Sequence, residues 1–273
     1  DGIPQAPSFI ANSFDQSAEG PGGTGRDFFD PAIYGEIVVM KGPSLTQDSG
    51  GALGGAVNLS TPDVSKILGA EQYLFEQSLG YFDVDQSIHS LTTGAVQSGP
   101  FSVLARYSYR DGEARANNGR TPENPTEYTS EAALVKGLYN LNTENVVTVT
   151  AESYRKKQAS EVDSAEDPMN FYANERVYTE DLRERERISI GYESQALDSW
   201  FADSVELVGF YQSTRSQAYN IQQGGVPGFP VLLRDREQTN THEINAYGGS
   251  LHFRKDFEAG PLAHRFRYGL NLQ

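Results

Sequence analysis

The feature that most constrains this chain is a series of segments in which apolar and polar side chains alternate, from about Tyr73 onward. The clearest segment covers residues 101–110. One face carries Phe101, Val103, Ala105, Tyr107 and Tyr109, the other carries Ser102, Arg106, Ser108 and Arg110, and only Leu104 breaks the rule. A period of two residues is typical of a half-buried β-strand. We therefore predict a mainly β chain with about nine strands of roughly ten residues each.

The connections between these segments alternate in length. Short turns are expected at 98–100, 140–144, 196–202 and 259–263, and long polar loops at 112–127, 156–178 and 217–236. Short turns at one end and long loops at the other are typical of a transmembrane antiparallel β-barrel, with periplasmic turns and extracellular loops. A soluble β-sandwich also alternates, but its strands are shorter and nothing places its long loops at one end. The pattern favours the barrel and leaves the sandwich as the alternative.

Composition narrows the class of protein further. With 37 acidic and 22 basic residues, the chain has a net charge of −15 and would repel a phosphate backbone, so nucleic acid is not an expected partner. The absence of cysteine removes disulfides and thiolate chemistry. No run approaches the ~20 consecutive apolar residues of a spanning helix, so any crossing of a membrane would use strands.

In a barrel, the alternation assigns side chains to lipid or to the lumen. We predict that lipid contacts Phe101, Val103, Tyr107, Ile188, Ile190, Phe266, Tyr268 and Leu270, and that the lumen or rim contains Arg106, Arg187, Arg265 and Arg267. The charged run 183–187 is expected near the outer rim, because a charge that faces lipid at mid-depth costs ~2–4 kcal/mol. The segments around Ala132 and Tyr247 are less regular, and β-bulges are expected there.

Residues 1–70 differ from the rest of the chain. They contain a β-branched run at 37–39, a turn at 41–44, a glycine cluster at 50–55 and a second short strand at 56–60. Segments 36–44 (EIVVMKGPS) and 51–58 (GALGGAVN) resemble the plug signature of TonB-dependent outer-membrane receptors, and the opening DGIPQ resembles the strand that precedes it. Glycines in such a signature let backbone pass close to backbone in a crowded lumen.

This resemblance implies that residues 1–70 are the C-terminal part of a plug domain and residues 71–273 the N-terminal part of a transmembrane β-barrel. Family members enclose the plug in a barrel of about 22 strands, so the chain is expected to be an internal piece of a longer protein. The implied location is the outer membrane of a Gram-negative bacterium. The implied partners are outer-membrane lipid, the TonB complex of the inner membrane and an iron-carrying ligand or haem protein.

Within the family, two barrel segments are most similar to the haem and haemoglobin receptor subgroup. They are YSYRDG at 107–112, leading to Asn118-Gly119, and HRFRYG at 264–269. The resemblance implies energy-coupled uptake of haem or another iron chelate as transported ligand, with no cofactor required. A siderophore or cobalamin receptor is the first alternative, followed by a passive porin, a soluble β-sandwich binding protein and an outer-membrane enzyme active at its rim.

The resemblance also assigns candidate site residues. The plug signature falls on Lys41, Gly42, Pro43, Ser44, Gly51, Gly54, Gly55 and Asn58. Relatives usually have an acidic residue where Val38 stands and arginine where Lys41 stands, a pair that helps lock the plug to the barrel wall. Because this chain departs from both, that lock is not carried over.

Candidates for ligand contact are fewer. Plug loops of the family can face the ligand, which suggests Phe9, Arg26, Phe28 and Phe29. His242 is added because strand parity places it in the lumen near the outer end, although the plainer interpretation is an ordinary polar lumen residue. The axial histidines of haem-binding relatives lie upstream of this chain and in a later loop, so neither is assigned here.

Enzyme chemistry is the weaker class of function. No G-x-S-x-G elbow is present, and His242-Glu243 is not followed by the second histidine of a zinc protease motif, so no catalytic residue is assigned. The acidic residues at 161–167 lack the ligand order and central glycine of an EF-hand, and no metal site is expected.

Overall fold

The computed structural model describes residues 3–4, 28–42, 54–115, 124–162, 173–197, 199–225, 236–259 and 262–272. In chain order, the elements are η1 (Pro31–Ile33), β1 (Glu36–Lys41), β2 (Gly55–Ser60), α1 (Val64–Leu68), β3 (Tyr73–Phe82), β4 (Ser87–Ser98), β5 (Phe101–Glu113), β6 (Thr126–Asn140), β7 (Asn145–Glu161), β8 (Ala173–Ser194), β9 (Ser204–Gly225), β10 (Arg236–Ala259) and β11 (Leu262–Leu272). Among the described residues, no helix is long and apolar enough to cross a membrane.

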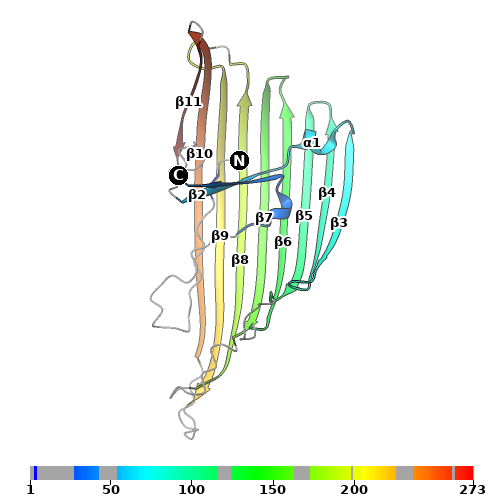
Figure 1. Cartoon of the computed structure of the whole chain (residues 1–273), viewed down its shortest axis with the longest axis vertical. Coiled ribbons are helices and arrows are strands. Elements are labelled where there is room, and N and C mark those ends of the chain that lie inside the picture. Colours follow the sequence, from blue (N-terminus) through cyan, green and yellow to red (C-terminus); the bar gives the residue numbers. More distant parts are fainter. Residues whose placement is uncertain are drawn as a thin grey trace.

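Strands β3 to β11 form one sheet, in which each strand pairs antiparallel with the next in sequence (Figure 1). This meander of nine strands confirms the predicted mainly β fold class and excludes two stacked sheets of short strands. The turn between β4 and β5 contains Gly99 at φ 57°, a conformation that glycine adopts without strain. β4 ends at Ser98 and β5 begins at Phe101, which places this turn where the alternation predicted.

The described residues before β3, which we call the N-terminal segment, include a separate two-stranded sheet in which β1 pairs antiparallel with β2. In Figure 1 this hairpin lies across the strands of the large sheet. The two short helices beside it are set by local chemistry. Asp30 caps η1 by accepting a hydrogen bond from the backbone N–H of Ala32 at 2.9 Å. Asp63 caps α1 by accepting one from the backbone N–H of Ser65 at 2.9 Å.

The large sheet has an inner face, which we define as the face that contacts the N-terminal segment, and an outer face. Every side chain predicted to contact lipid lies on the outer face and is exposed. They are Phe101, Val103, Tyr107, Ile188, Ile190, Phe266, Tyr268 and Leu270. The register places Arg106, Arg187, Arg265 and Arg267 on the inner face, as predicted.

The apolar residues of the outer face form a belt that crosses the strands obliquely. On β3 the belt begins at Tyr73, nearest the short turns, and extends to Tyr81. The residue on β11 at the same level as Tyr73 is Leu272, reached through directly paired residues that include Val103 and Ile190. On β3 the belt extends from this level toward the long-loop end, whereas on β11 it extends from this level toward the short turns. The belt therefore shifts by about one residue per strand, which corresponds to a strand tilt of roughly 35°.

The strands lengthen steadily along the sheet, from 10 residues in β3 to 24 in β10. The loops predicted at 156–178 and 217–236 are therefore too long, because β7 continues to Glu161, β8 begins at Ala173 and β9 continues to Gly225. A strand needs only ~9–11 residues to cross a membrane. The additional residues of β8, β9 and β10 extend the sheet toward the long-loop end.

The irregular segments predicted to hold bulges are regular strands. Around Ala132 and Tyr247 the register is continuous on both sides, and in the described part of the large sheet the register shifts only between Asn174 and Arg176. Ala132 breaks the alternation because it is buried on the inner face against the N-terminal segment, and Leu104 does so for the same reason. The exceptions to the pattern thus mark where η1, α1 and their flanking residues pack on the large sheet.

Candidate functional site

The N-terminal segment is held to the inner face through Tyr34, whose side chain enters a buried cluster of charges. Its hydroxyl donates to Glu152 Oε2 at 2.7 Å and accepts from Arg185 Nη2 at 2.8 Å. Arg185 also donates to Glu152 Oε2 at 2.6 Å, and Arg187 Nη2 donates to Glu152 Oε1. We call these four residues the Tyr34 anchor. It joins the C-cap of η1 to neighbouring positions on β7 and β8.

Burial sets the electrostatics of the anchor. The side chains of Glu152 and Arg185 are fully buried, and that of Arg187 is 4% exposed. A buried charge is tolerated when it is paired and hydrogen-bonded, and here two guanidinium groups and one hydroxyl surround a single carboxylate. Burial, and then the negative charge of Glu152, raises the pKa of Tyr34 to about 12. Tyr34 therefore remains a hydrogen-bond donor at neutral pH.

Further hydrogen bonds connect β5 and β6 to the N-terminal segment. They run from Arg106 to the carbonyl oxygens of Ala32 (3.4 Å) and Tyr34 (3.1 Å), from Ser108 to Asp30 (2.6 Å), and from Lys136 to the Thr61 hydroxyl (3.0 Å) and the Pro62 carbonyl (3.3 Å). All the donors lie on the inner face and reach groups in the turns of the segment. Such groups have no strand partner and need one from elsewhere.

An apolar core lies under these polar contacts. Phe28, Ile33, Val64 and Leu68 of the N-terminal segment form one buried cluster with Ala95, Leu104, Ala132, Leu134 and Tyr154 of the sheet. Leu104 and Leu134 are both fully buried on the inner face. Burying a leucine side chain contributes about 1.5–3 kcal/mol, so this core holds the segment against the wall together with the Tyr34 anchor.

The described plug-signature residues lie in or directly beside β1 and β2. Lys41 ends β1 and pairs with Gly55, and Asn58 pairs with Val38. Gly55 adopts φ 130°, and a Cβ there would lie 2.4 Å from the Met40 carbonyl oxygen, so a larger residue would not fit. Gly42 and Gly54 flank the turn. Pro43, Ser44 and Gly51 lie outside the described residues.

The structure separates the ligand-contact candidates. Phe28 is 2% exposed in the shared core, and Phe29 packs beside it with its ring 6.2 Å from that of Tyr34, which gives both a packing role. His242 is exposed on the inner face of β10, opposite Ser216, as its parity predicted. Phe9 and Arg26 lie outside the described residues. No group of acidic and histidine side chains among the described residues could hold a metal ion.

Sequence reasoning missed the anchor itself. The charged run 183–187 was expected near the outer rim, whereas Arg185 and Arg187 lie at the level of Tyr34 and are buried against the N-terminal segment. The signal for this was the three arginines on one strand face. The partner Glu152 could not be paired with them without the register of β7 and β8.

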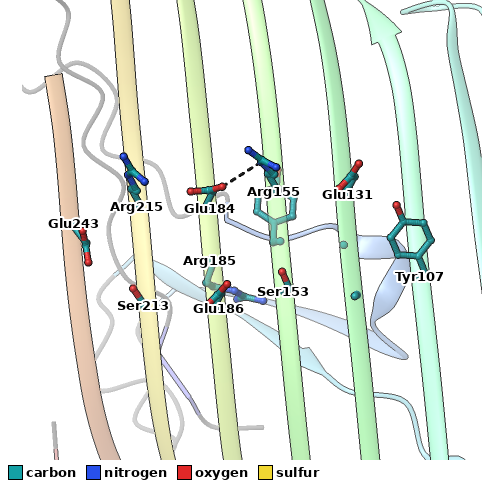
Figure 2. Close-up of a pocket in the computed structure, with 13 residues that line it drawn as sticks. Tyr107, Glu131, Ser153, Arg155, Glu184, Arg185, Glu186, Ser213, Arg215 and Glu243 are labelled. Atoms are coloured by element: carbon teal, nitrogen blue, oxygen red, sulfur yellow. Dashed lines mark ion pairs between the residues drawn. The ribbon is translucent and has the colours of Figure 1, made fainter. Parts of the chain in front are cut away.

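The outer face at the same level carries a row of charges of a different kind. Directly paired residues on β6 to β10 alternate in sign, in the order Glu131, Arg155, Glu184, Arg215 and Glu243. Figure 2 shows these side chains on neighbouring strands, with Arg155 Nε 3.1 Å from Glu184 Oε1. Opposite charges across neighbouring strands each contribute roughly 0.2–1 kcal/mol, so this row stabilises the sheet without the N-terminal segment.

Comparison with known proteins finds similarity at low identity. The chain is 25% identical over 238 residues to the hemoglobin and hemoglobin-haptoglobin-binding protein A of Haemophilus influenzae, which covers 80% of this chain and 22% of that protein. It is also 25% identical over 224 residues to the probable hemoglobin and hemoglobin-haptoglobin-binding protein 4 of the same species, which covers 76% of this chain and 22% of that protein. The chain thus spans about a fifth of the length of these relatives. No family model matches it.

Proposed function

We propose that this chain is part of an outer-membrane receptor that binds a haem protein or haem and imports an iron compound, with haem as the favoured ligand. In this proposal, β3 to β11 are wall strands of a transmembrane barrel and the N-terminal segment is part of its plug. The TonB complex would supply the energy by pulling on that plug. The receptor does no chemistry on its ligand.

One observation carries the proposal: the outer face has an oblique apolar belt, while the inner face holds a packed segment of the same chain. A belt tilted by roughly 35° agrees with the ~35–45° of strands in transmembrane barrels. Aromatic side chains near its edges, such as Tyr81 and Tyr211 on one side and Phe101 and Phe257 on the other, are typical of membrane interfaces. An occupied inner face favours a gated receptor over a passive porin.

The choice of ligand is supported by the relatives, whose names state that they bind haemoglobin and haemoglobin–haptoglobin. The similarity covers 80% of this chain. In the structure, β8 and β10 extend beyond the length that a membrane requires. Long strands on one side of a membrane offer the surface that a protein ligand needs.

Growth assays test the proposal directly. A deletion strain of the source bacterium, carrying the gene on a plasmid, is grown with haemoglobin, haem, a siderophore complex or cobalamin as the required nutrient. We expect plasmid-dependent growth on haemoglobin and haem that disappears when TonB is inactivated. Growth on the siderophore or cobalamin alone would replace the ligand, and growth on haem without TonB would refute energy coupling.

A further inference from the structure

The short turn between β8 and β9 carries the most exposed aromatic side chain of the described residues. It is Trp200, the one tryptophan of the chain, and its exposed fraction is 91%. A single exposed apolar side chain needs no explanation by itself. The surroundings of Trp200 therefore decide whether it has a role.

The backbone of this turn is closed by its own hydrogen bonds. The N–H of Leu197 donates to the carbonyl oxygen of Asp203 at 2.8 Å, and the N–H of Ser199 donates to that of Ala202 at 3.1 Å. The Ser199 hydroxyl also donates to the Ala202 carbonyl oxygen at 2.9 Å and accepts from the Ala202 N–H at 3.0 Å. Ala202 is fully buried. The turn thus holds Trp200 at a fixed place on the surface.

The same turn neutralises a charge on the outer face of β10. Between Tyr247 and Ala259, Lys255 is the only charged side chain on that face. Its ammonium donates to the Asp203 carboxylate at 2.5 Å and to the Ser199 carbonyl oxygen at 2.9 Å. A basic side chain that faces lipid is destabilising. The ion pair with the turn therefore makes this part of the face compatible with an apolar medium.

Aromatic rings continue from the apolar belt to the tip of the turn. Tyr268 of β11 stacks on Phe253 of β10 with ring centres 5.4 Å apart, and both belong to the outer face. The Phe253 ring meets that of Phe201 at 5.7 Å, and the Phe201 ring meets that of Trp200 at 5.6 Å. The Tyr268 hydroxyl also donates to the Phe201 carbonyl oxygen at 2.5 Å. The exposed indole is thus the last of a series of rings that begins in the belt.

The tilt of the belt places its edge at this turn. Gly209 on β9 lies at the level of Tyr73, where the belt begins on β3. A shift of about one residue per strand from β3 to β9 moves this edge by about six residues toward the short turns, to Asp203. The same count on β10 leads from Gly249 to Asp256, whose N–H donates to the Asp203 carboxylate at 2.8 Å. The turn therefore lies where the apolar surface ends.

We propose that the β8–β9 turn is a membrane anchor, which seats the Trp200 ring at the boundary between the acyl chains and the headgroups of a phospholipid leaflet. Indole combines a large apolar ring with one N–H donor, which suits a boundary that is apolar on one side and wet on the other. Strands β8, β9 and β10 are longer than a membrane requires, so a fixed point at their short-turn end sets how deep they lie. The inference rests on the transmembrane barrel of the proposed function and not on its ligand.

The first test measures the depth of Trp200 in the natural protein, folded into phosphatidylcholine vesicles that carry bromine at chosen depths along the acyl chains. The emission of Trp200 is the difference between the natural protein and Trp200→Phe. We expect bromine near the headgroups to quench this emission about twofold more than bromine at the chain ends, and iodide in the water to quench it weakly. Quenching by iodide alone would place the ring in water, open to a protein partner, and would overturn the anchor. Stronger quenching by bromine at the chain ends would overturn the placement at the headgroups.

A matched control moves the indole to the other face of the sheet. Glu258 is exposed on the inner face of β10, close to the same turn. Combining Glu258→Trp with Trp200→Phe keeps the number of tryptophans unchanged. The emission of the moved indole should be quenched by iodide and unaffected by bromine at any depth.

The second test removes the ring. Trp200→Ser should unfold from the vesicles in urea about fivefold faster than the natural protein, and Trp200→Tyr, which keeps a ring with a polar end, should restore most of the difference. Heat-modifiable gel migration in detergent should be the same for all three proteins, because a ring that is 91% exposed packs little against the rest of the chain. Equal unfolding rates for Trp200→Ser and the natural protein would overturn the anchor.

The outcomes separate this inference from the proposed function. Quenching by bromine near the headgroups in a protein that supports no growth on haem would retain the anchor and overturn the ligand. Quenching by iodide alone in a protein that does support growth on haem would overturn the anchor and retain the receptor.

Discussion

The two faces of the nine-stranded sheet are built from the same strands yet differ in charge. Basic residues predominate on the inner face, which carries Arg106, Arg110, Lys136, Lys156, Arg183, Arg185, Arg187, Arg236, Arg254, Arg265 and Arg267. Acidic residues predominate on the outer face, which carries Asp111, Glu113, Glu127, Glu131, Glu161, Glu180, Glu184, Glu186, Glu237 and Glu243. The net charge of the chain therefore describes neither surface.

This difference follows from the two-residue period of a strand, because successive side chains point to opposite faces and so have different surroundings. The outer face combines an apolar belt with charges that pair across neighbouring strands. The inner face meets polypeptide, and part of its charge is buried in the Tyr34 anchor. Neighbouring residues on one strand can therefore be substituted to test the two faces separately.

The largest effect is expected from Glu152→Ala, compared with Glu131→Ala on the outer face. Removing Glu152 leaves the buried charges of Arg185 and Arg187 without their carboxylate, which costs about 3–5 kcal/mol. Glu131 belongs to an exposed row, and its loss should cost about 0–1 kcal/mol. Thermal unfolding and protease sensitivity of the N-terminal segment measure both. Equal losses would show that the anchor does not hold the segment.

A smaller effect is expected from Ile190→Arg, which introduces a charge into the apolar belt of the outer face. Ser189→Arg on the inner face is the control. Arginine that faces lipid at mid-depth costs about 2–4 kcal/mol. Ser189 lines an inner cavity with Thr148 and Thr150, where the longer side chain has space and polar surroundings. Urea titration of folding into lipid vesicles compares the two. A greater cost at Ser189 would reverse the assignment of the faces.

Tyr34→Phe should have a moderate effect. The substitution keeps the ring and removes the hydroxyl that joins Glu152 to Arg185, with an expected cost of about 1–2 kcal/mol. The two arginines remain paired with Glu152, so the wall itself should be unaffected. Protease digestion should release the N-terminal segment more readily while the heat-modifiable migration of the barrel stays the same. If the segment is released and the heat-modifiable migration is also lost, the N-terminal segment supports the wall.

The smallest effect is expected at Asp203, in the turn between β8 and β9, which belongs to neither face. The hydrogen bond from Lys255, and then that from the Asp256 backbone, hold the pKa of the Asp203 carboxyl below its usual 3.8. Because the folded-state pKa is lowered, the stabilisation is present above the unfolded pKa and is lost as pH falls through the folded value.

Asp203→Asn should therefore lower the melting temperature slightly at neutral pH and have no effect at about pH 2. Melting curves of the natural protein and the variant at both pH values provide the measurement. A difference that persists in acid would mean that the turn depends on the shape of the side chain and not on its charge.

The alternation of side chains predicted the sheet well, because each outer-face position is decided by a local pattern. Phe101, Ile188 and Leu270 were placed correctly without any knowledge of their partners. The ends of the strands near the long loops were not predicted. Beyond the belt, β8 has polar residues on both faces, with Thr179 and Asp181 on the inner face and Glu180 on the outer face, which removes the contrast that reveals a strand.

The Tyr34 anchor could not be predicted for a different reason. It depends on register, which joins Glu152 to Arg187 and Tyr154 to Arg185 across a long stretch of sequence. A shift of one residue would place each of these side chains on the opposite face. The apolar exceptions Leu104 and Ala132 did carry information, because each marked a place where a second part of the chain covers the sheet.

The sequence separation within the Tyr34 anchor has a consequence for biosynthesis. The hydroxyl of Tyr34 bonds to residues 118 and 151 positions later in the chain. A ribosome that adds ~5–20 residues per second needs on the order of ten seconds to make those partners after Tyr34 has emerged. The N-terminal segment is thus made first and docks late, because the binding site for the Tyr34 side chain exists only once β7 and β8 have paired.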